Sequence, residues 1–174
     1  MTESRLDSVV IVLFEPQNPI NIAATIRAMK NMGVSRLRLV RPVEYNVVNL
    51  EGIAHQTMDL IEAIATFDSF EAAVADCVRV FGFTARRRAA KLRVLDPKEA
   101  ASDLLDAAVD GPVALVFGRE DSGLPNDVLD RVNAAVTIPT TNHASLNLAH
   151  AAVIALYELH LAAADATRTV APSR

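Results

Sequence analysis

Short apolar runs of strand length alternate with helical patterns along most of this chain. The apolar runs lie at residues 8–14, 37–40, 78–83, 112–117 and 135–138. Helical spacing is present at residues 20–32, 58–66, 70–76, 97–109, 125–132 and 145–164, and residues 43–56 look irregular. Strands that are apolar throughout are typical of a parallel sheet buried on both faces. The pattern predicts an α/β fold in which a mostly parallel sheet is covered by helices on both faces.

Length and composition limit the classes of protein to consider. The chain has 174 residues, half of them hydrophobic, and no linker or repeat divides it, so we expect a single domain over residues 1–174. No apolar run approaches the roughly 20 residues that span a bilayer, and the charged N-terminus lacks a signal-peptide core. The single cysteine, Cys77, excludes an internal disulfide, and no Cys/His spacing resembles a metal site. We therefore expect a cytoplasmic protein without membrane contact or metal, with Cys77 partly buried and chemically inert.

Basic residues are concentrated in two windows although the net charge is −4. Residues 27–41 contain five Arg or Lys and residues 79–93 contain six, with no acid in either window. Such segregation can give an acidic protein a basic surface for phosphate groups. For the first window, a phosphate-binding face and an ordinary solvated face fit equally well. In the second window, the density of Arg86, Arg87 and Arg88 favours contact with an anion.

Three loops that follow predicted strands are rich in polar and small residues. They are residues 82–86, 118–124 and the stretch after Ile138. In parallel sheets, ligands bind beyond the carboxyl ends of the strands, so these loops could converge at one edge. Ser145 is a good N-cap for the last helix, and its hydroxyl, the Asn147 amide and main-chain groups of Ile138 suit a nucleoside-like ligand. By itself, the stretch after Ile138 favours an ordinary strand-to-helix connection, and the case for a binding site depends on the three loops together.

Three motifs, read together, resemble the SPOUT superfamily of RNA methyltransferases, in its ribose 2′-O-methylating spoU branch. The motifs are Asn21-Ile22-Ala23-Ala24 with Arg27, Phe117-Gly118-Arg119-Glu120 through Gly123-Leu124, and Ile138-Pro139 followed by Ser145-Leu146-Asn147-Leu148. They span nearly the whole chain, and the combination is specific although each motif alone is weak. Ala23 stands where the family often has Gly. Residues 29–33 and 117–124 are most similar to the bacterial enzymes that methylate ribose 32 of tRNA, without the C-terminal extension that those enzymes usually carry.

The resemblance implies a fold, a reaction and partners. It implies a deep trefoil knot near the C-terminal end of the domain and a homodimer in which the first and last helices pack across the interface. It also implies S-adenosylmethionine as methyl donor and RNA as substrate, with tRNA nucleotide 32 preferred. An rRNA 2′-O-methyltransferase and a non-catalytic knotted RNA-binding relative are the alternatives within the family. A nucleotide-dependent oxidoreductase is disfavoured because residues 15–19, after the first strand, hold no glycine-rich phosphate loop.

The resemblance also assigns roles to particular residues. Those expected to bind the cofactor are Phe83, Thr84, Ala85, Gly118, Ile138, Ala144, Ser145 and Leu146. The catalytic group is expected to comprise Arg27, Asn21, Glu120, Ser145 and Asn147. Because a guanidinium is effectively always protonated, we expect Arg27 to hold a phosphate of the RNA rather than to act as a base. Arg86, Arg87, Arg88 and Lys91 are expected to bind the RNA backbone.

Overall fold

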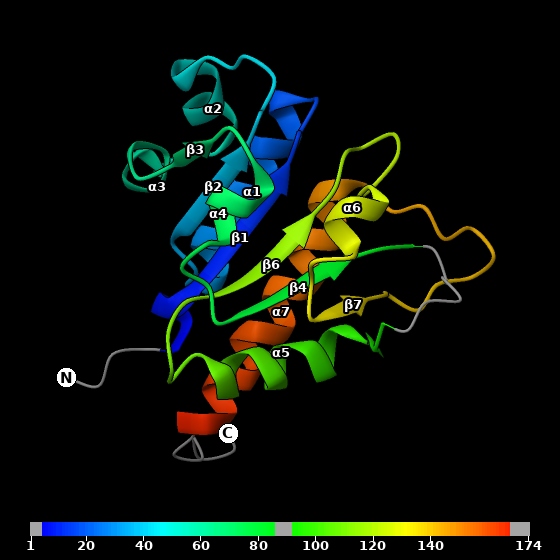
Figure 1. Ribbon diagram of the computed structural model, residues 1–174. Coiled ribbons are helices and arrows are strands. Elements are labelled where there is room, and N and C mark those ends of the chain that lie inside the picture. The colour runs from blue at the N-terminus through cyan, green and yellow to red at the C-terminus, as the bar shows by residue number, and fades with distance from the viewer. Residues whose placement is uncertain (1–4, 86–91, 168–174) are drawn as a thin grey trace.

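A seven-stranded parallel sheet forms the centre of the computed structural model, which describes residues 5–85 and 92–167 (Figure 1). The strands are β1 (Val9–Phe14), β2 (Arg36–Val40), β3 (Ala65–Phe67), β4 (Arg79–Phe83), β5 (Val94–Leu95), β6 (Val113–Phe117) and β7 (Ala134–Val136). Their order is β3-β2-β1-β6-β4-β7-β5. All strand pairs are parallel. The prediction of a mostly parallel α/β sheet is therefore confirmed.

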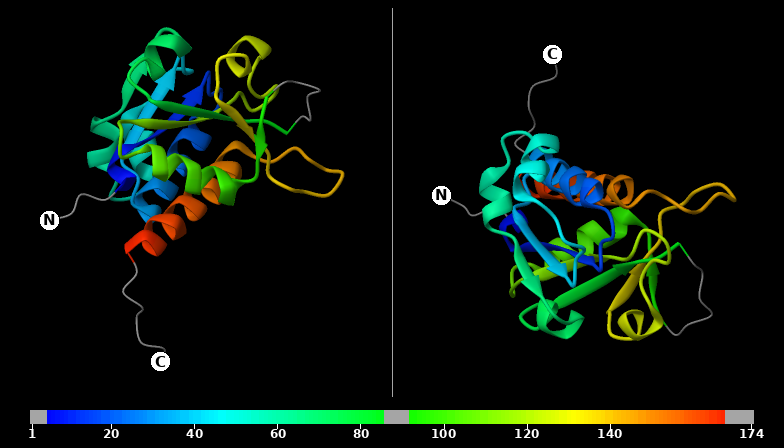
Figure 2. Two further views of the ribbon diagram at one scale, coloured as in Figure 1. Left: turned by 60° about the horizontal axis from the view of Figure 1, so that its bottom comes forward. Right: turned by 90° about the horizontal axis from the view of Figure 1, so that it is seen from above.

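Helices cover both faces of the sheet. They are α1 (Pro19–Met32), α2 (Val47–Ile53), α3 (Met58–Glu62), α4 (Phe70–Val74), α5 (Pro97–Ala107), α6 (Asn126–Leu129) and α7 (Leu148–Thr167), preceded by the 3-10 turn η1 (Arg5–Ser8). Alternate residues of β1 point to opposite faces. Ile11 and Leu13 pack with α1, α5 and α7, whereas Val10 and Val12 pack with α4 and α6. Figure 2 shows α1 and α7 side by side over one face.

The caps of α1 and α5 follow directly from their sequences. At α1, the Asn18 side chain accepts a hydrogen bond from the Ile20 amide, and Gly33 ends the helix with a φ of 81°. At α5, Asp96 and Glu99 form a reciprocal capping box before a proline-led helix. Both helices lie within two residues of their predicted bounds because these signals are local.

Three elements are missing from the sequence-based prediction. The stretch predicted to be irregular contains α2, which Asn46 caps through a hydrogen bond from the Val48 amide at 2.8 Å. Most of α2 is exposed, so no apolar period marks it. The predicted helix over residues 58–66 ends at Glu62 and gives way to β3. Strands β3 and β5 have three and two residues, too few for a period, and exist because neighbouring strands offer main-chain partners.

The trefoil knot that the resemblance implies stays a prediction. Among the helices of the described ranges, none combines the length and apolar composition needed to cross a bilayer.

Candidate functional site

A cavity of about 310 Å³ lies at the carboxyl edge of the sheet, beyond β4, β6 and β7. Three stretches far apart in the sequence form its walls: residues 83–85, the loop of residues 117–124, and residues 138–148 with Ala151. The predicted convergence of the three loops is therefore correct. All eight residues expected to bind a cofactor line this cavity: Phe83, Thr84, Ala85, Gly118, Ile138, Ala144, Ser145 and Leu146.

The inner wall of the cavity is apolar and its edge is polar. Phe83 and Phe117 stack with ring centroids 4.4 Å apart, which joins β4 to β6. The Thr84 amide donates to the Val136 carbonyl at 3.0 Å, and the Thr137 hydroxyl donates to the Thr84 carbonyl at 2.9 Å. These bonds hold the β4 and β7 ends together. An apolar slot with a few placed polar groups is the usual form of a small-molecule site, roughly 300–1,000 Å³ in size.

Gly118 is required by its own loop. A Cβ atom at this position would lie 2.1 Å from the Gly123 carbonyl carbon and 2.3 Å from the Leu124 nitrogen. The loop is closed by two main-chain hydrogen bonds between Arg119 and Gly123, of 3.2 and 2.9 Å. The close approach of residues 123 and 124 is therefore the immediate reason for a glycine at position 118. Gly118 also lines the cavity, as expected of a cofactor-binding residue.

Glu120 connects the 117–124 loop to the start of α1. Its carboxylate accepts hydrogen bonds from the Gln17 amide at 2.8 Å, the Asn18 amide at 2.7 Å and the Asn21 side chain at 3.1 Å. A carboxylate at a helix N-terminus is favoured by the helix dipole and by the unpaired amides there. Glu120 therefore fixes the position of α1 relative to the cavity wall.

Asn147 extends this chain of hydrogen bonds to α7. Its amide nitrogen donates to Asn21 Oδ1 at 3.2 Å, and its Oδ1 accepts from the amides of Ala149 at 2.8 Å and His150 at 3.2 Å. Asn147 is thus the N-cap of α7, and the prediction that Ser145 caps this helix is wrong. Both types are good caps, but only Asn147 directly precedes the first helical residue, Leu148. Ser145 is exposed and lines the cavity.

Arg27 lies outside the cavity formed by this chain. It is exposed on α1, six residues beyond Asn21, which corresponds to about 9 Å along the helix axis. It is not among the residues that line the cavity. Of the five predicted catalytic residues, Asn21, Glu120 and Asn147 form one hydrogen-bonded chain, Ser145 is at the cavity wall, and Arg27 stands apart.

Ion pairs can be assigned in the first of the two basic windows, residues 27–41. In the first, Lys30 pairs with Asp59, Arg38 with Asp76, and Arg41 with Glu15, at distances of 3.0, 2.6 and 3.1 Å. Most of its charge is therefore already matched by acids, against the idea of a free phosphate-binding face. The dense part of the second window, with Arg86, Arg87, Arg88 and Lys91, lies outside the described residues.

Two groups beside the Arg38 guanidinium, Asp76 and Cys77, have shifted pKa values with different main causes. The hydrogen bond from Arg38 is the main cause that lowers the pKa of Asp76 to about 2. Burial is the main cause that raises the pKa of the Cys77 thiol to about 11. Cys77 is half-buried just before β4, as predicted. A thiol with a raised pKa is a poor nucleophile at neutral pH.

Sequence reasoning overlooked Gln17 and Asn18. Both lie between two prolines directly after β1, and both donate main-chain hydrogen bonds to Glu120. Strand order reverses between β1 and β6, which is where parallel sheets place their ligand crevice. Polar residues at the end of the first strand were the available signal. Over residues 5–85 and 92–167, His, Cys, Asp and Glu side chains form no group of three that could hold a metal ion.

Comparison with known proteins gives consistent matches. The profile of the SpoU rRNA Methylase family matches residues 8–157. The chain is 40% identical over 159 residues to the tRNA (cytidine/uridine/adenosine-2'-O-)-methyltransferase TrmJ of Pseudomonas aeruginosa (strain UCBPP-PA14), covering 90% of this chain and 62% of that relative. The chain thus spans less than two thirds of the relative's length.

Two solved structures are also similar. One is a probable methylase family protein from Haemophilus influenzae Rd KW20, with a TM-score of 0.87, 32% identity, and coverage of 97% of this chain and 72% of that one. The other concerns the 2-OH methylation of C/U34 on tRNA, with a TM-score of 0.70, 27% identity, and coverage of 90% and 97%.

Proposed function

Because this chain belongs to the SpoU rRNA methylase family, we propose that it is an S-adenosylmethionine-dependent 2′-O-methyltransferase that acts on tRNA ribose. The observation that carries the proposal is the cavity at the carboxyl edge of the sheet. It gathers the three loops that follow β4, β6 and β7, two of which carry family motifs, and a hydrogen-bonded chain of Glu120, Asn21 and Asn147 runs beside it. The name of the Pseudomonas relative supports tRNA as the substrate class.

The cavity fits the cofactor chemically. An adenosine needs an apolar slot with polar groups at its edge, and Phe83, Ile138 and Leu146 supply apolar walls beside the main chain of residues 84–85 and 144–145. Bound S-adenosylmethionine supplies a methyl group on a positively charged sulfur, which is a good leaving group. The protein then has to align a ribose hydroxyl with that methyl group and ease the loss of the hydroxyl proton.

Arg27, Asn21, Glu120, Ser145 and Asn147 carry this alignment in the proposal. Arg27 stays protonated and holds a phosphate beside the target ribose, so that the phosphate or a water molecule accepts the proton. Asn21, Asn147 and Glu120 fix the positions of α1, the 117–124 loop and the start of α7 relative to one another. Ser145 contacts the ligand from the cavity wall. Arg86, Arg87, Arg88 and Lys91 hold the RNA backbone.

A second copy of the chain is the proposed protein partner. Val153, Tyr157 and Leu161 recur every four residues on α7 and are 36–49% exposed, as an apolar stripe that a homodimer would bury. Ile20, 58% exposed, lies seven residues before Arg27 and therefore on the same face of α1. A dimer formed through α1 and α7 would cover the face of α1 that carries Ile20 and Arg27. Chromatography with light scattering tests the dimer, and Tyr157→Glu is expected to yield monomers.

The finer substrate in this proposal is nucleotide 32 of the anticodon loop, on the motif resemblance. Nucleotide 34 is the second candidate, because one similar structure concerns C/U34. rRNA is the third. Mass spectrometry of tRNA and rRNA from a deletion strain separates the three, since loss of one ribose methylation identifies the target.

Calorimetry and a methyl-transfer assay test the activity. S-adenosylhomocysteine is expected to bind and NAD is not, and heat from NAD alone would favour an oxidoreductase. The wild type is expected to methylate unmodified tRNA, whereas Arg27→Ala keeps cofactor binding and loses turnover. Binding of cofactor and RNA without turnover by the wild type would favour the non-catalytic relative. Replacing Arg86, Arg87 and Arg88 by Ala is expected to weaken RNA binding and flatten its salt dependence.

A further inference from the structure

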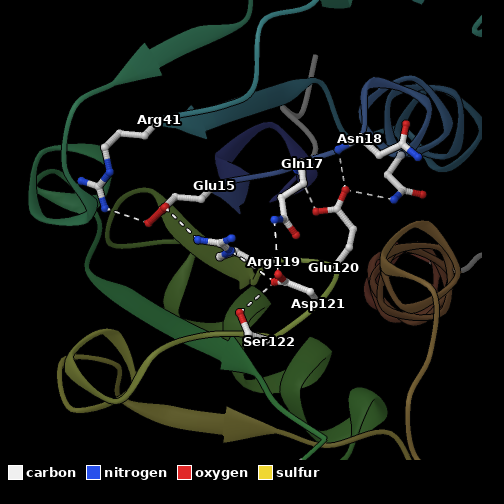
Figure 3. A network of polar contacts seen from close by, with 9 residues as sticks. Glu15, Gln17, Asn18, Arg41, Arg119, Glu120, Asp121 and Ser122 are labelled. Carbon is white, nitrogen blue, oxygen red and sulfur yellow. Dashed lines mark hydrogen bonds and ion pairs between the residues drawn. The ribbon is translucent and has the colours of Figure 1, made fainter.

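Consecutive side chains of the 117–124 loop reach back to the segment that follows β1 (Figure 3). Arg119 lies 3.6 Å from Glu15 Oε2 and 3.3 Å from Asp121 Oδ1. With its amide turned to satisfy both ends, Gln17 accepts from Arg119 at 2.8 Å and donates to Asp121 at 3.1 Å. Arg41 completes this group, and we call Glu15, Gln17, Arg41, Arg119 and Asp121 the edge network.

Glu15 is the centre of the edge network. One carboxylate oxygen lies 3.1 Å from Arg41, and the other faces Arg119. Arg41 is itself anchored, because it donates to the Asp68 carbonyl at 2.6 Å and its guanidinium lies 5.4 Å from the centre of the Phe14 ring. The carboxylate of Glu15 thus joins the ends of β1 and β2 to the loop after β6.

The backbone conformation of Glu15 and Arg41 is unusual for residues with side chains. Glu15 and Arg41 both have left-handed conformations, with φ of 48° and 41°, which side chains other than glycine rarely adopt. Each is kept there by a main-chain hydrogen bond, from Glu15 to Val40 at 2.8 Å and from Arg41 to Phe67 at 3.0 Å. Backbone outliers of this kind gather where geometry is constrained by function.

We propose that Glu15 is a positioning residue for the methyl transfer. Its carboxylate faces Arg119, and this holds the loop so that the residue that follows, Glu120, reaches α1. Arg119 and the rest of the same loop line the cavity. Glu15 does not line that cavity, so it acts on the reaction only through the loop. The inference rests on the proposed function.

The expected effect is on turnover more than on binding. Without the charge of Glu15, Arg119 and its loop lose one anchor, but the three hydrogen bonds of Glu120 remain. The apolar walls at Phe83 and Ile138 are untouched, so cofactor affinity should hardly change. Because small misalignments reduce rates strongly, we expect kcat to fall about tenfold.

Glu15→Gln, compared with Glu71→Gln, tests the proposal. Glu71 pairs with Arg131 on the surface, with both side chains about half exposed, and neither lines the cavity. Glu15→Gln should lose about tenfold in kcat while the dissociation constant of S-adenosylhomocysteine changes less than about threefold. Glu71→Gln should match the wild type in both. A kcat of Glu15→Gln within about twofold of wild type, or an equal loss in Glu71→Gln, overturns the proposal.

Two further measurements keep the outcomes distinct. If Glu15→Gln does not fold, Glu15→Asp replaces it, because the carboxylate is then one methylene shorter and is drawn away from Arg41 and Arg119, and the same results decide. Hydrogen exchange of the Gly123 amide, which donates to the Arg119 carbonyl at 2.9 Å, needs no activity and should be faster in Glu15→Gln. Unchanged exchange overturns the role of Glu15, whereas a wild type that binds no S-adenosylhomocysteine and methylates no RNA overturns the proposed function itself.

Discussion

Two arginines that lie three residues apart form ion pairs of different kinds. Arg38 is buried in its pair, and Arg41 is largely exposed in its pair. Arg38, inside β2, donates two hydrogen bonds to Asp76 at 2.6 and 2.9 Å and one to the Ala73 carbonyl, and its side chain is 11% exposed. Arg41, just past the end of β2, belongs to the edge network, and its side chain is 47% exposed. The chemistry is the same, but the surroundings differ in burial and backbone strain.

The buried pair is expected to stabilise the fold, whereas the exposed pairs around the 117–124 loop are expected to position the site. Removing one partner of a desolvated pair leaves a charge without compensation, which is costly. Removing one partner of an exposed pair costs little, since water replaces it. We therefore expect variants of the Arg38–Asp76 pair to unfold more easily with normal cofactor binding, and variants around the 117–124 loop to fold normally and react slowly.

Glu120→Gln should have the largest effect. Glutamine presents an NH₂ group to at least one of the three donors that Glu120 now accepts from, so the loop and α1 should separate slightly. We expect kcat to fall about 100-fold, equivalent to about 2.7 kcal/mol of activation free energy, in single-turnover assays. Asp127→Asn, an exposed change on α6, is the control. A loss below about fivefold would contradict the positioning role.

Asp76→Asn should have the largest effect on stability. Arg38 would keep its bond to the Ala73 carbonyl and lose its carboxylate. Because Asp76 itself is about half exposed, we expect a loss of about 2 kcal/mol in the free energy of unfolding, below the value for a fully buried pair. Urea denaturation measures it, and calorimetry should give an unchanged affinity for S-adenosylhomocysteine. The double variant with Arg38→Met should cost less than the sum of the single changes.

Asn147→Ala tests whether the hydrogen bonds of Asn147, between the cavity and α7, stabilise the fold or position the site. The variant removes the N-cap of α7 and the bond to Asn21. We expect about 1 kcal/mol of lost stability by thermal or urea unfolding. Ser145→Ala, at the position that the sequence favoured as the cap, should leave the stability unchanged. Equal losses in both variants would mean that capping is shared.

Acid should reduce the contribution of the Arg38–Asp76 pair. The pKa of Asp76 is lowered from 3.8 to about 2, so its stabilising effect is complete above about pH 4 and disappears as the pH falls through 2. The stability difference between wild type and Asp76→Asn should shrink by about 1 kcal/mol over this window, after allowing for the exposure of Asp76. A difference that stays constant from pH 5 to about 2 would contradict the assigned cause.

Local signals in the sequence predicted much of the fold. β1 and β6 were found because an apolar run of strand length needs no knowledge of its neighbours, and α1 and α5 were found because their caps are written in adjacent residues. The rule that parallel strands end at one edge predicted that the three loops could converge, and the family resemblance assigned Phe83, Gly118 and Ser145 to the site; all three line the cavity.

Contacts between distant residues escaped sequence reasoning. The hydrogen bond from Asn147, the cap of α7, to Asn21 joins residues that lie 126 positions apart in the sequence. The partners of Glu15 and Glu120 lie up to 104 residues away in the sequence. The pairing of β1 with β6 brings the segments that follow these two strands together.

The amino-acid pattern alone determined the α/β class and the family of motifs, because apolar periodicity and short motifs are properties of neighbouring residues. The tertiary structure decided which charges are neutralised inside the protein and which side chains meet at the edge of the sheet. Hydrogen bonds and ion pairs act over a few ångströms, and only the folded chain brings their partners within that distance.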